Sequence, residues 1–423
     1  MKKFFTKNHL FPSLLLLSFT ADIIRYFNLI FTSEFRWIIL FISFLFVISH
    51  VLFKQIVSLN VLQITLIYAF WSILTYFWSE NPQLSIMKAT ALLLVIVVAV
   101  GYGYIFIFSN TIENALDYMF PMVLTVAVGA FLGQTNVTTQ EGLTFFSGGT
   151  SNPNEFGALC AMSIPFALWK YENSKKNYLR ILSGIACIFF TILVVISNSR
   201  NAIIVMICIN IGLFWKNKTS IHLGIYYKIL IGSVIIIVLF PGLFGTSLHD
   251  IIYKGKGKSN LTSSRDLVWE ESYSQAKKGG IIGGGYGVTI GTETQFKGNL
   301  NASGYGREKG NSQFGIMEET GIIGLIIYII STIMIFYVVI KKWQMCMDIK
   351  QKKLLGIIIG LLFGFLLSSM VEGWYNAPGS SECIYYWFII GTALGLVKKK
   401  YKISGPSSIL MKQRNKKVKH YLA

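Results

Sequence analysis

The stretch IMKATALLLVIVVAVGYGYIFIF (residues 86–108) decides the fold, because it is a long apolar run in which Lys88 is the single charge. About 20 consecutive apolar residues cross the hydrocarbon core of a bilayer as a helix. Runs of this kind recur along the chain and predict an all-α polytopic membrane protein of about twelve transmembrane helices. The expected spans are 10–30, 35–53, 59–78, 86–108, 115–133, 154–169, 179–198, 200–215, 225–243, 314–340, 354–371 and 383–397.

The composition agrees with this fold class. Of the 423 residues, 53% are hydrophobic and 13% are charged, whereas a soluble domain carries about 25% charged residues. The 32 Phe, 21 Tyr and 9 Trp exclude a disordered chain. The five cysteines are scattered and form no CxxC pair, so neither a zinc site nor a disulfide framework is indicated. We therefore expect residues 1–423 to form a single integral membrane domain.

The distribution of positive charge predicts the orientation. If the N-terminus is cytoplasmic, the inner segments carry 25 of the 38 Lys and Arg residues, as the positive-inside rule requires. Both termini are then cytoplasmic, and the basic tail at 398–423 would meet anionic lipid headgroups rather than nucleic acid. The first apolar run also fits a signal peptide, but its small-residue cleavage signature is poor, so we expect it to stay uncleaved.

One long segment, 244–313, contains no spanning run and is expected to be a large extracytoplasmic loop. Loops of this length tend to be functional. Within it, TSSRDLVWEESYSQAKKGG (262–280) predicts a short helix, because Ser263 and Asp266 fit a capping box. A charged helix with Trp and Tyr beside a membrane is typical of an interfacial lid. The following GGIIGGGYG (279–287) lacks the Lys-Ser/Thr ending of a phosphate loop and is interpreted as a tight connector.

Two arginines on the outer face are candidates for anion binding. Arg200 lies between two apolar runs, where an ionisable residue is a functional hypothesis by default; the alternative is an arginine that extends to the headgroups. Arg265 opens the predicted loop helix, where a cation opposes the helix dipole, so a nearby anion would explain it. A pair with Asp266 or Glu270 is the structural alternative. Two guanidinium groups could hold a diphosphate in a bidentate way.

Carboxylates and amides near the outer face are further candidates. Glu318 and Glu319 begin a span, where desolvation would raise a carboxyl pKa and provide a general base. Acidic residues in a first helical turn also simply complement the helix dipole. Asn152 and Asn154 precede an apolar run and could either cap a helix or bind sugar or phosphate. No carboxylate cluster suggests a metal, and we expect no cofactor.

Four segments together resemble the bacterial O-antigen polymerase and O-antigen ligase superfamily, which acts on lipid-linked glycans. The resemblance is carried by GGTSNPNEFGALCAMSIPFAL (148–168), SNSRNAIIVMICINIGLF (197–214), SSRDLVWEESYSQAKKGGIIGGGYG (263–287) and GNSQFGIMEETGIIG (310–324). They occur in the family's order. Ligases of this family carry His, Asn, nine residues and then Gly-x-x-Gly. Here Asn311, Gly321 and Gly324 fit, but Gly310 stands at the His position, which favours a polymerase.

The resemblance implies a GT-C-like, metal-independent glycosyltransferase at the outer face of the cytoplasmic membrane. Its donor and acceptor would be polyprenyl-diphosphate-linked glycans, with a chain-length regulator and a flippase of the same pathway as partners. Arg200 and Arg265 match the family's functional arginines and would hold the diphosphate, with Asn152, Asn154 and Asn311 also in contact with substrate. A ligase, and a lipid-linked oligosaccharide flippase or transporter, are the alternatives. Transporters of that kind usually show internal repeats and broken helices at the midplane.

Overall fold

The computed structural model describes residues 7–24, 27, 33–54, 59–133, 136–138, 144–214, 266–290 and 309–399. These residues form twelve α-helices, three single-turn 3-10 helices and one two-stranded antiparallel hairpin. The elements in chain order are α1 (Lys7–Ile23), α3 (Ser33–Lys54), α4 (Leu59–Leu74), η1 (Thr75–Trp78), α5 (Pro82–Ser109), η2 (Ile112–Asn114), η3 (Asp117–Met119), α6 (Phe120–Leu132), β1 (Asn136–Thr138), β2 (Thr144–Phe146), α7 (Pro153–Asn173), α8 (Asn177–Ile196), α9 (Arg200–Phe214), α12 (Asp266–Lys278), α13 (Ser312–Met345), α14 (Ile349–Ser369) and α15 (Ser381–Lys398).

The described helices make a multi-pass membrane protein plausible. Eleven of the expected spans coincide with helices or helical segments, and the remaining one, 225–243, lies outside the described residues. By length and composition, five helical segments can cross a membrane: Pro82–Ser109, Ile112–Leu132, Asn177–Ile196, Ser312–Met345 and Ile349–Ser369. Three shorter apolar helices accompany them: Leu10–Ile23, Thr65–Trp78 and Arg200–Leu213. The total of twelve spans stays a prediction.

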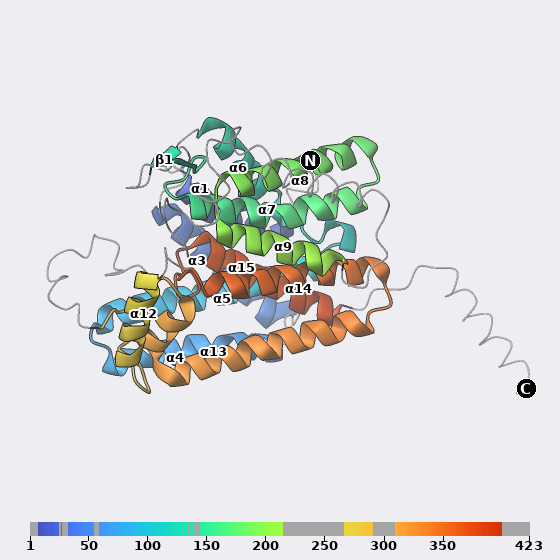
Figure 1. Cartoon of the computed structure of the whole chain (residues 1–423). Helices are drawn as coiled ribbons and strands as arrows, with labels where there is room; N and C mark the ends of the chain where they lie inside the picture. Colours follow the sequence, from blue (N-terminus) through green and yellow to red (C-terminus); the bar gives the residue numbers. More distant parts are fainter. Residues whose placement is uncertain are drawn as a thin grey trace, which may run out of the picture.

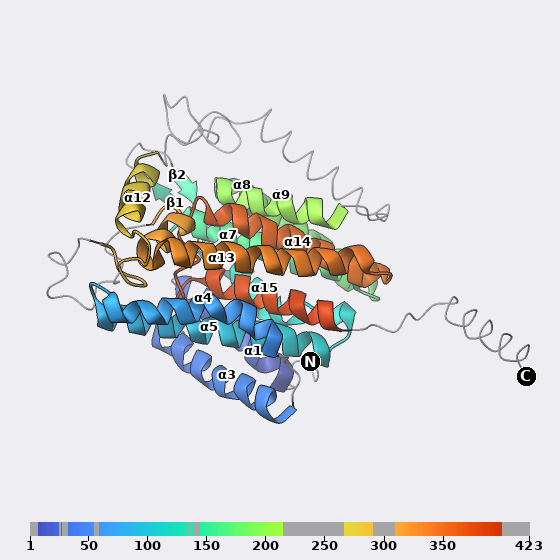
Figure 2. The ribbon, with the colours of Figure 1, turned by 90° about the horizontal axis from the view of Figure 1, so that it is seen from below.

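The axes of the long helices are roughly aligned, and α12 lies across one end of the bundle. Helices α5 and α15 pack together in the middle (Figure 1; Figure 2). Glycines allow the close approach of these two helices. A Cβ atom at Gly103 would overlap the backbone of Phe388, and one at Gly391 would overlap the carbonyl of Val100. Helices α9 and α14 meet in the same way at Gly212. Small residues at helix contacts are characteristic of membrane bundles, where van der Waals packing stabilises helix association.

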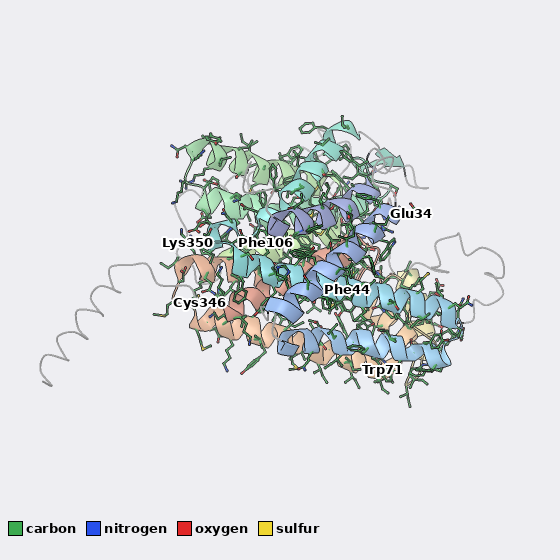
Figure 3. The ribbon with its side chains drawn as sticks, turned by 180° about the vertical axis from the view of Figure 1, so that it is seen from behind. Glu34, Phe44, Trp71, Phe106, Cys346 and Lys350 are labelled. Atoms are coloured by element: carbon green, nitrogen blue, oxygen red, sulfur yellow. The ribbon has the colours of Figure 1, made fainter. Side chains whose placement is uncertain are left out.

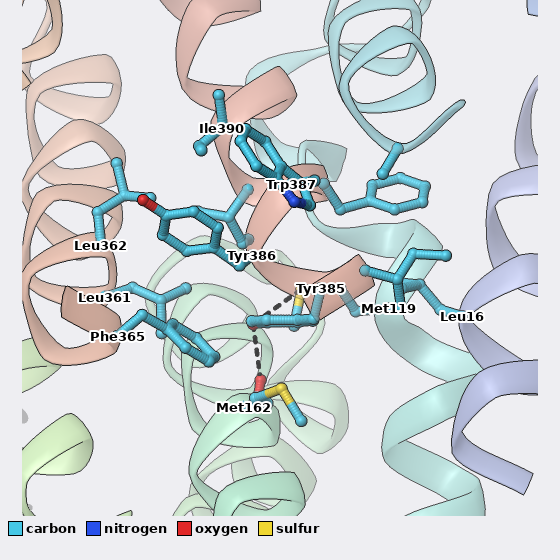
Figure 4. Close-up of a cluster of buried hydrophobic side chains, with 14 of the residues drawn as sticks. Leu16, Met119, Met162, Leu361, Leu362, Phe365, Tyr385, Tyr386, Trp387 and Ile390 are labelled. Carbon is cyan, nitrogen blue, oxygen red and sulfur yellow. Dashed lines mark hydrogen bonds between the residues drawn. The ribbon is translucent and has the colours of Figure 1, made fainter. Parts of the chain in front are cut away.

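Aromatic side chains of α15 fill the centre of the bundle (Figure 4). Tyr385 is fully buried, and its hydroxyl donates to the carbonyl of Met162 on α7 at 2.9 Å. The ring of Phe365 from α14 lies 5.7 Å from the ring of Tyr385. Because a buried tyrosine hydroxyl needs a hydrogen-bond partner, this contact fixes the register of α15 against α7.

The two ends of the bundle differ in charge (Figure 3, where Lys350 and Cys346 mark one end and Glu34 the other). We call the basic end the one where α7, α13 and α15 finish and where α8 and α14 begin. Its cations are Lys170, Lys175, Lys176, Arg180, Lys341, Lys342, Lys350, Lys352, Lys353, Lys398 and Lys399. Lys399 donates to the carbonyls of Ile107 and Asn110 at the end of α5, and burial lowers the pKa of its ammonium. The expected cytoplasmic orientation of this end stays a prediction.

We call the opposite end the site end. It contains the starts of α5, α7, α9, α13 and α15, together with α12 and a glycine loop at residues 279–290 (Figure 1). The helix expected in the long loop is present as α12 and ends at Lys278, directly before Gly279. The described parts of the four segments that carry the family resemblance contribute to this end.

Candidate functional site

Arg200 is positioned by a sharp turn between α8 and α9. Asn198 has φ of 52°, a left-handed conformation in which Asn is better tolerated than most residues. Ser199 directly precedes α9, and its hydroxyl accepts from the amide of Ala202 at 3.3 Å. A Cβ atom at Gly157 of α7 would overlap the side chain of Ser199. The turn is therefore wedged against the start of α7, and Arg200 lies half-buried in the first turn of α9 at the site end.

The two candidate asparagines on α7 have structural contacts. Asn152 caps α7, because its side-chain oxygen accepts from the amide of Asn154 at 2.9 Å. The side-chain amide of Asn154 donates to Glu372 at 3.3 Å. Glu372 lies in the loop between α14 and α15, which sequence analysis did not single out as a contact of α7. These contacts favour the capping interpretation for Asn152, and substrate binding by either amide stays a prediction.

Asn311 caps α13 and also fastens it to the same loop. Its side-chain oxygen accepts from the amide of Phe314 at 2.9 Å, and its side-chain nitrogen donates to the carbonyl of Met370 at 2.8 Å. The hydroxyl of Ser312 donates to the carbonyl of Glu372 at 2.8 Å. The α14–α15 loop thus joins the start of α13 to the start of α7, which brings two of the resemblance segments together.

Glu318 and Glu319 lie in a buried ionic cluster. Both are fully buried, and Lys309 makes a direct ion pair with Glu319 and lies 3.6 Å from a carboxylate oxygen of Glu318. Asn376 donates to the other oxygen of Glu319 at 2.8 Å, and the amide of Ile290 donates to Glu318 at 3.2 Å. Burial and pairing favour a structural part for these carboxylates. Their role as general bases stays a prediction.

Tyrosines connect this ionic cluster to the rest of the site end. The hydroxyl of Tyr68 donates to the side-chain oxygen of Asn376 at 2.8 Å. The hydroxyl of Tyr286 donates to the backbone carbonyl of Asn376 at 3.1 Å. The cluster therefore ties α4, the glycine loop, α13 and the α14–α15 loop into one network. Sequence analysis missed Lys309 and Asn376; the one signal for Lys309 was its place at the end of a short charged run, Arg307–Lys309, just before a span that begins with two glutamates.

Helix α13 is broken at Gly321, where φ is 71° and ψ is −173°. The glycine loop supplies hydrogen bonds that the break removes. The amides of Gly284 and Gly285 donate to the carbonyls of Glu318 and Glu319 at 3.0 Å each. The amides of Ile322 and Ile323, just after the break, donate to the carbonyls of Gly280 and Ile281, and Trp71 donates to the carbonyl of Thr320. Buried backbone groups need such partners, so the loop and the broken helix form one unit.

Helix α12 covers the start of α13. The indole of Trp269 donates to the carbonyl of Gly310 at 3.1 Å, and the ring of Tyr273 lies 5.6 Å from that of Phe314. A Cβ atom at Gly310 would overlap the side chain of Val268. The position at which the family's ligases carry histidine therefore faces Val268 of α12, so a larger side chain there would require the side chain of Val268 to shift.

Arg265 lies outside the described residues, and α12 begins one residue later at Asp266. The predicted convergence of Arg265 with Arg200 on one anion therefore stays a prediction. The start of α12 and the start of α9 lie at the same end of the bundle (Figure 1; Figure 2). Among the described residues, no group of three or more His, Cys, Asp or Glu side chains could hold a metal ion.

Comparison with protein-family models and with curated proteins found no match for this chain. The resemblance to the O-antigen polymerase and ligase superfamily therefore depends on the four quoted segments. Each of them has described residues at the site end, and the α14–α15 loop joins the first segment to the fourth through Glu372.

Proposed function

We propose that this protein is a glycosyltransferase that polymerises polyprenyl-diphosphate-linked repeat units into a surface polysaccharide. The observation that carries the proposal is the gathering of the resemblance segments at the site end, with Arg200 in the first turn of α9. In the proposed orientation this end faces outward and the basic end faces the cytoplasm, in accord with the positive-inside rule. The proposed location is the cytoplasmic membrane of a bacterium.

The proposed reaction places negative charge on the leaving group. The bond between the anomeric carbon of the donor sugar and the diphosphate oxygen breaks, and a hydroxyl oxygen of the acceptor glycan bonds to that carbon and loses its proton. Guanidinium groups of Arg200 and Arg265 would stabilise the departing diphosphate, because they donate in a bidentate way to phosphate oxygens. The positive end of the α9 dipole would add to this effect at Arg200.

The geometry at Gly310 supports a polymerase over a ligase. This chain carries no histidine there, and a side chain at this position would overlap the side chain of Val268 on α12. Transport is less well supported. The break in α13 at Gly321 comes after only nine residues of the helix, near one end, whereas transporters usually break helices at the midplane.

Conservative replacement of the two arginines tests the proposal. Arg200→Lys and Arg265→Lys keep the charge but remove the bidentate fork. Hydrogen bonds to charged groups are worth about 1.5–3 kcal/mol, so we expect each variant to lower polymer formation about tenfold or more. The measurement is the ladder of polymer lengths in a deletion strain that expresses each variant at equal protein level. Arg180→Lys at the basic end, where the guanidinium stacks 5.2 Å from the ring of Tyr171, is the matched control and should give a normal ladder.

Normal ladders from Arg200→Lys and Arg265→Lys would reject the diphosphate role. The deletion strain itself distinguishes the alternatives. A single attached repeat unit would support a polymerase, whereas full-length but unattached polymer would indicate a ligase. Accumulation of lipid-linked units on the cytoplasmic side would indicate a flippase.

A further inference from the structure

The length and the exposed apolar face of α13 indicate where the membrane boundary lies. After the break at Gly321, about 24 residues remain to Met345, which at 1.5 Å per residue span about 36 Å. This length alone crosses a hydrocarbon core of about 30 Å. Exposed apolar side chains on α13 begin immediately after the break; they are Ile322, Ile326, Ile329, Ile330, Ile333, Met334, Tyr337 and Met345. The lipid-facing part of α13 therefore starts at the break, and the ionic cluster lies just beyond it.

Helix α4 and the η1 turn indicate the position of the same membrane boundary independently. From Leu59 to Trp78 the chain is helical for about 20 residues, enough for one crossing. Its exposed apolar side chains, Ile67, Phe70, Leu74, Tyr76 and Phe77, continue to the site end, and Phe77 is 77% exposed. Aromatic residues are enriched at the level where membrane meets water. On this evidence, the membrane boundary at the site end lies near Trp78.

The glycine loop connects these two boundary points at its tip. The carbonyl of Ile281 accepts from the amide of Ile323 at 3.2 Å, just after the break in α13. The carbonyl of Ile282 accepts from the indole of Trp78 at 3.1 Å, at the end of η1. The two isoleucine side chains are 67% and 42% exposed. Its contacts with α13 and η1 therefore place this apolar tip at the edge of the hydrocarbon core.

We propose that Ile281 and Ile282 insert into the lipid layer at the site end and hold α12 against the membrane surface. The occupant of this apolar surface is the acyl region of bilayer lipids, because the tip continues the lipid-facing faces of α4 and α13. Lys277 and Lys278, exposed in the last turn of α12, lie beside the tip, where cations meet anionic headgroups. This inference depends on the membrane placement of α13 and α4 and is independent of the proposed glycan chemistry.

Insertion of the tip would also set the depth of α12 relative to the lipid headgroups. Insertion would hold α12 (Asp266–Lys278) at the headgroup level. A lipid-linked diphosphate lies at that level, because its charged group borders the acyl region. The same anchoring would operate for any anionic lipid headgroup.

Spin labels on the full-length protein in phosphatidylcholine–phosphatidylglycerol vesicles test the insertion. A label at Ile281→Cys should collide with oxygen, which concentrates in the acyl region, and be shielded from a water-soluble nickel chelate. A label at Ser274→Cys, on the exposed face of α12, is the matched control and should show the reverse. We expect the ratio of oxygen to nickel accessibility to be several-fold higher at Ile281. All five native cysteines are buried, so background labelling should be low and is measured on the unmodified chain.

Ile282→Cys provides a second position, in case the first label disturbs the loop. Equal nickel accessibility at Ile281, Ile282 and Ser274 would place the tip in water and overturn the proposal. Shielding of both tip positions from oxygen and nickel alike would place the tip against protein and would overturn it as well. Because no glycan substrate is present, none of these outcomes depends on the polymerase proposal.

Discussion

Lysine–glutamate pairs occur at both ends of the bundle but in contrasting surroundings. At the site end, Lys309 and its partner Glu319 are buried, with the lysine side chain 5% exposed. At the basic end, Lys350 pairs with Glu113 at 2.6 Å while its side chain is 52% exposed. Water screens the second pair and not the first. The same two residue types therefore form a fully buried cluster at the site end and, in this pair, a solvated contact at the basic end.

Backbone geometry follows the same division. The site end contains a broken helix, a left-handed asparagine and a glycine loop, and side chains anchor each of them. At the basic end, by contrast, Asp348 caps α14 in the ordinary way, accepting from the amides of Lys350 and Gln351. Irregular backbone needs more specific partners than regular helix ends, so substitutions at the site end should have the larger effects.

Removal of Lys309 should produce the largest effect. Lys309→Met keeps the volume roughly constant but removes the ammonium that pairs with the buried carboxylates of Glu318 and Glu319. Breaking a buried ion pair from one side costs about 3–5 kcal/mol, so we expect a marked fall in the free energy of unfolding. The measurement is the thermal unfolding midpoint of the purified protein in detergent, compared with the unmodified chain.

Neutral partners should reverse much of that loss. When Glu318→Gln and Glu319→Gln are added to Lys309→Met, both carboxylates that lost their ion-pair partner become neutral, so stability should partly recover. If Lys309→Met were as stable as the unmodified protein, the cluster would not be an anchor and the contrast between the two ends would fail.

Two glycines offer an intermediate effect with an internal control. Gly280 and Gly321 both have positive φ, 57° and 71°, so alanine is strained at either position, by roughly 1–3 kcal/mol. Only at Gly321 would the new Cβ also overlap the carbonyl of Ile281; at Gly280 the space is open. Gly321→Ala should therefore lower the unfolding midpoint clearly more than Gly280→Ala. Equal effects would show that the loop does not pack tightly on the break.

The fold could be predicted from the sequence because each span is a local signal. Apolar length alone identified the described helices other than α12, and the capping and turn signals around Ser263, Lys278 and Gly279 predicted α12 and gave its end correctly. The break in α13 could not be predicted in this way. Gly321 was treated as one position of a continuous span, 314–340, and its conformation depends on hydrogen bonds from a loop about 40 residues earlier in the chain.

The candidate site was less predictable for a similar reason. Sequence patterns indicated Asn152 as a possible helix cap and Arg200 as a residue between two spans, while Asn311 entered through the family resemblance. The structure places all three at helix starts of one end. Sequence patterns did not indicate Lys309 as the partner of Glu319, or Asn376 as a ligand of the same carboxylate. These contacts join segments about 10 and 57 residues apart, and no local periodicity relates such residues.

The smallest effect should come from the exposed pair at the basic end. A double-mutant cycle on Lys350 and Glu113 should give a coupling energy of about 0.2–1 kcal/mol that decreases further with added salt. The neighbouring pair of Lys353 with Glu172, at 2.9 Å, is mostly buried, with 15% and 8% of the two side chains exposed. Since the two pairs share chemistry and location but differ in exposure, its coupling should be larger and less sensitive to salt. Equal couplings for the two pairs would mean that burial does not account for the difference between the ends of the bundle.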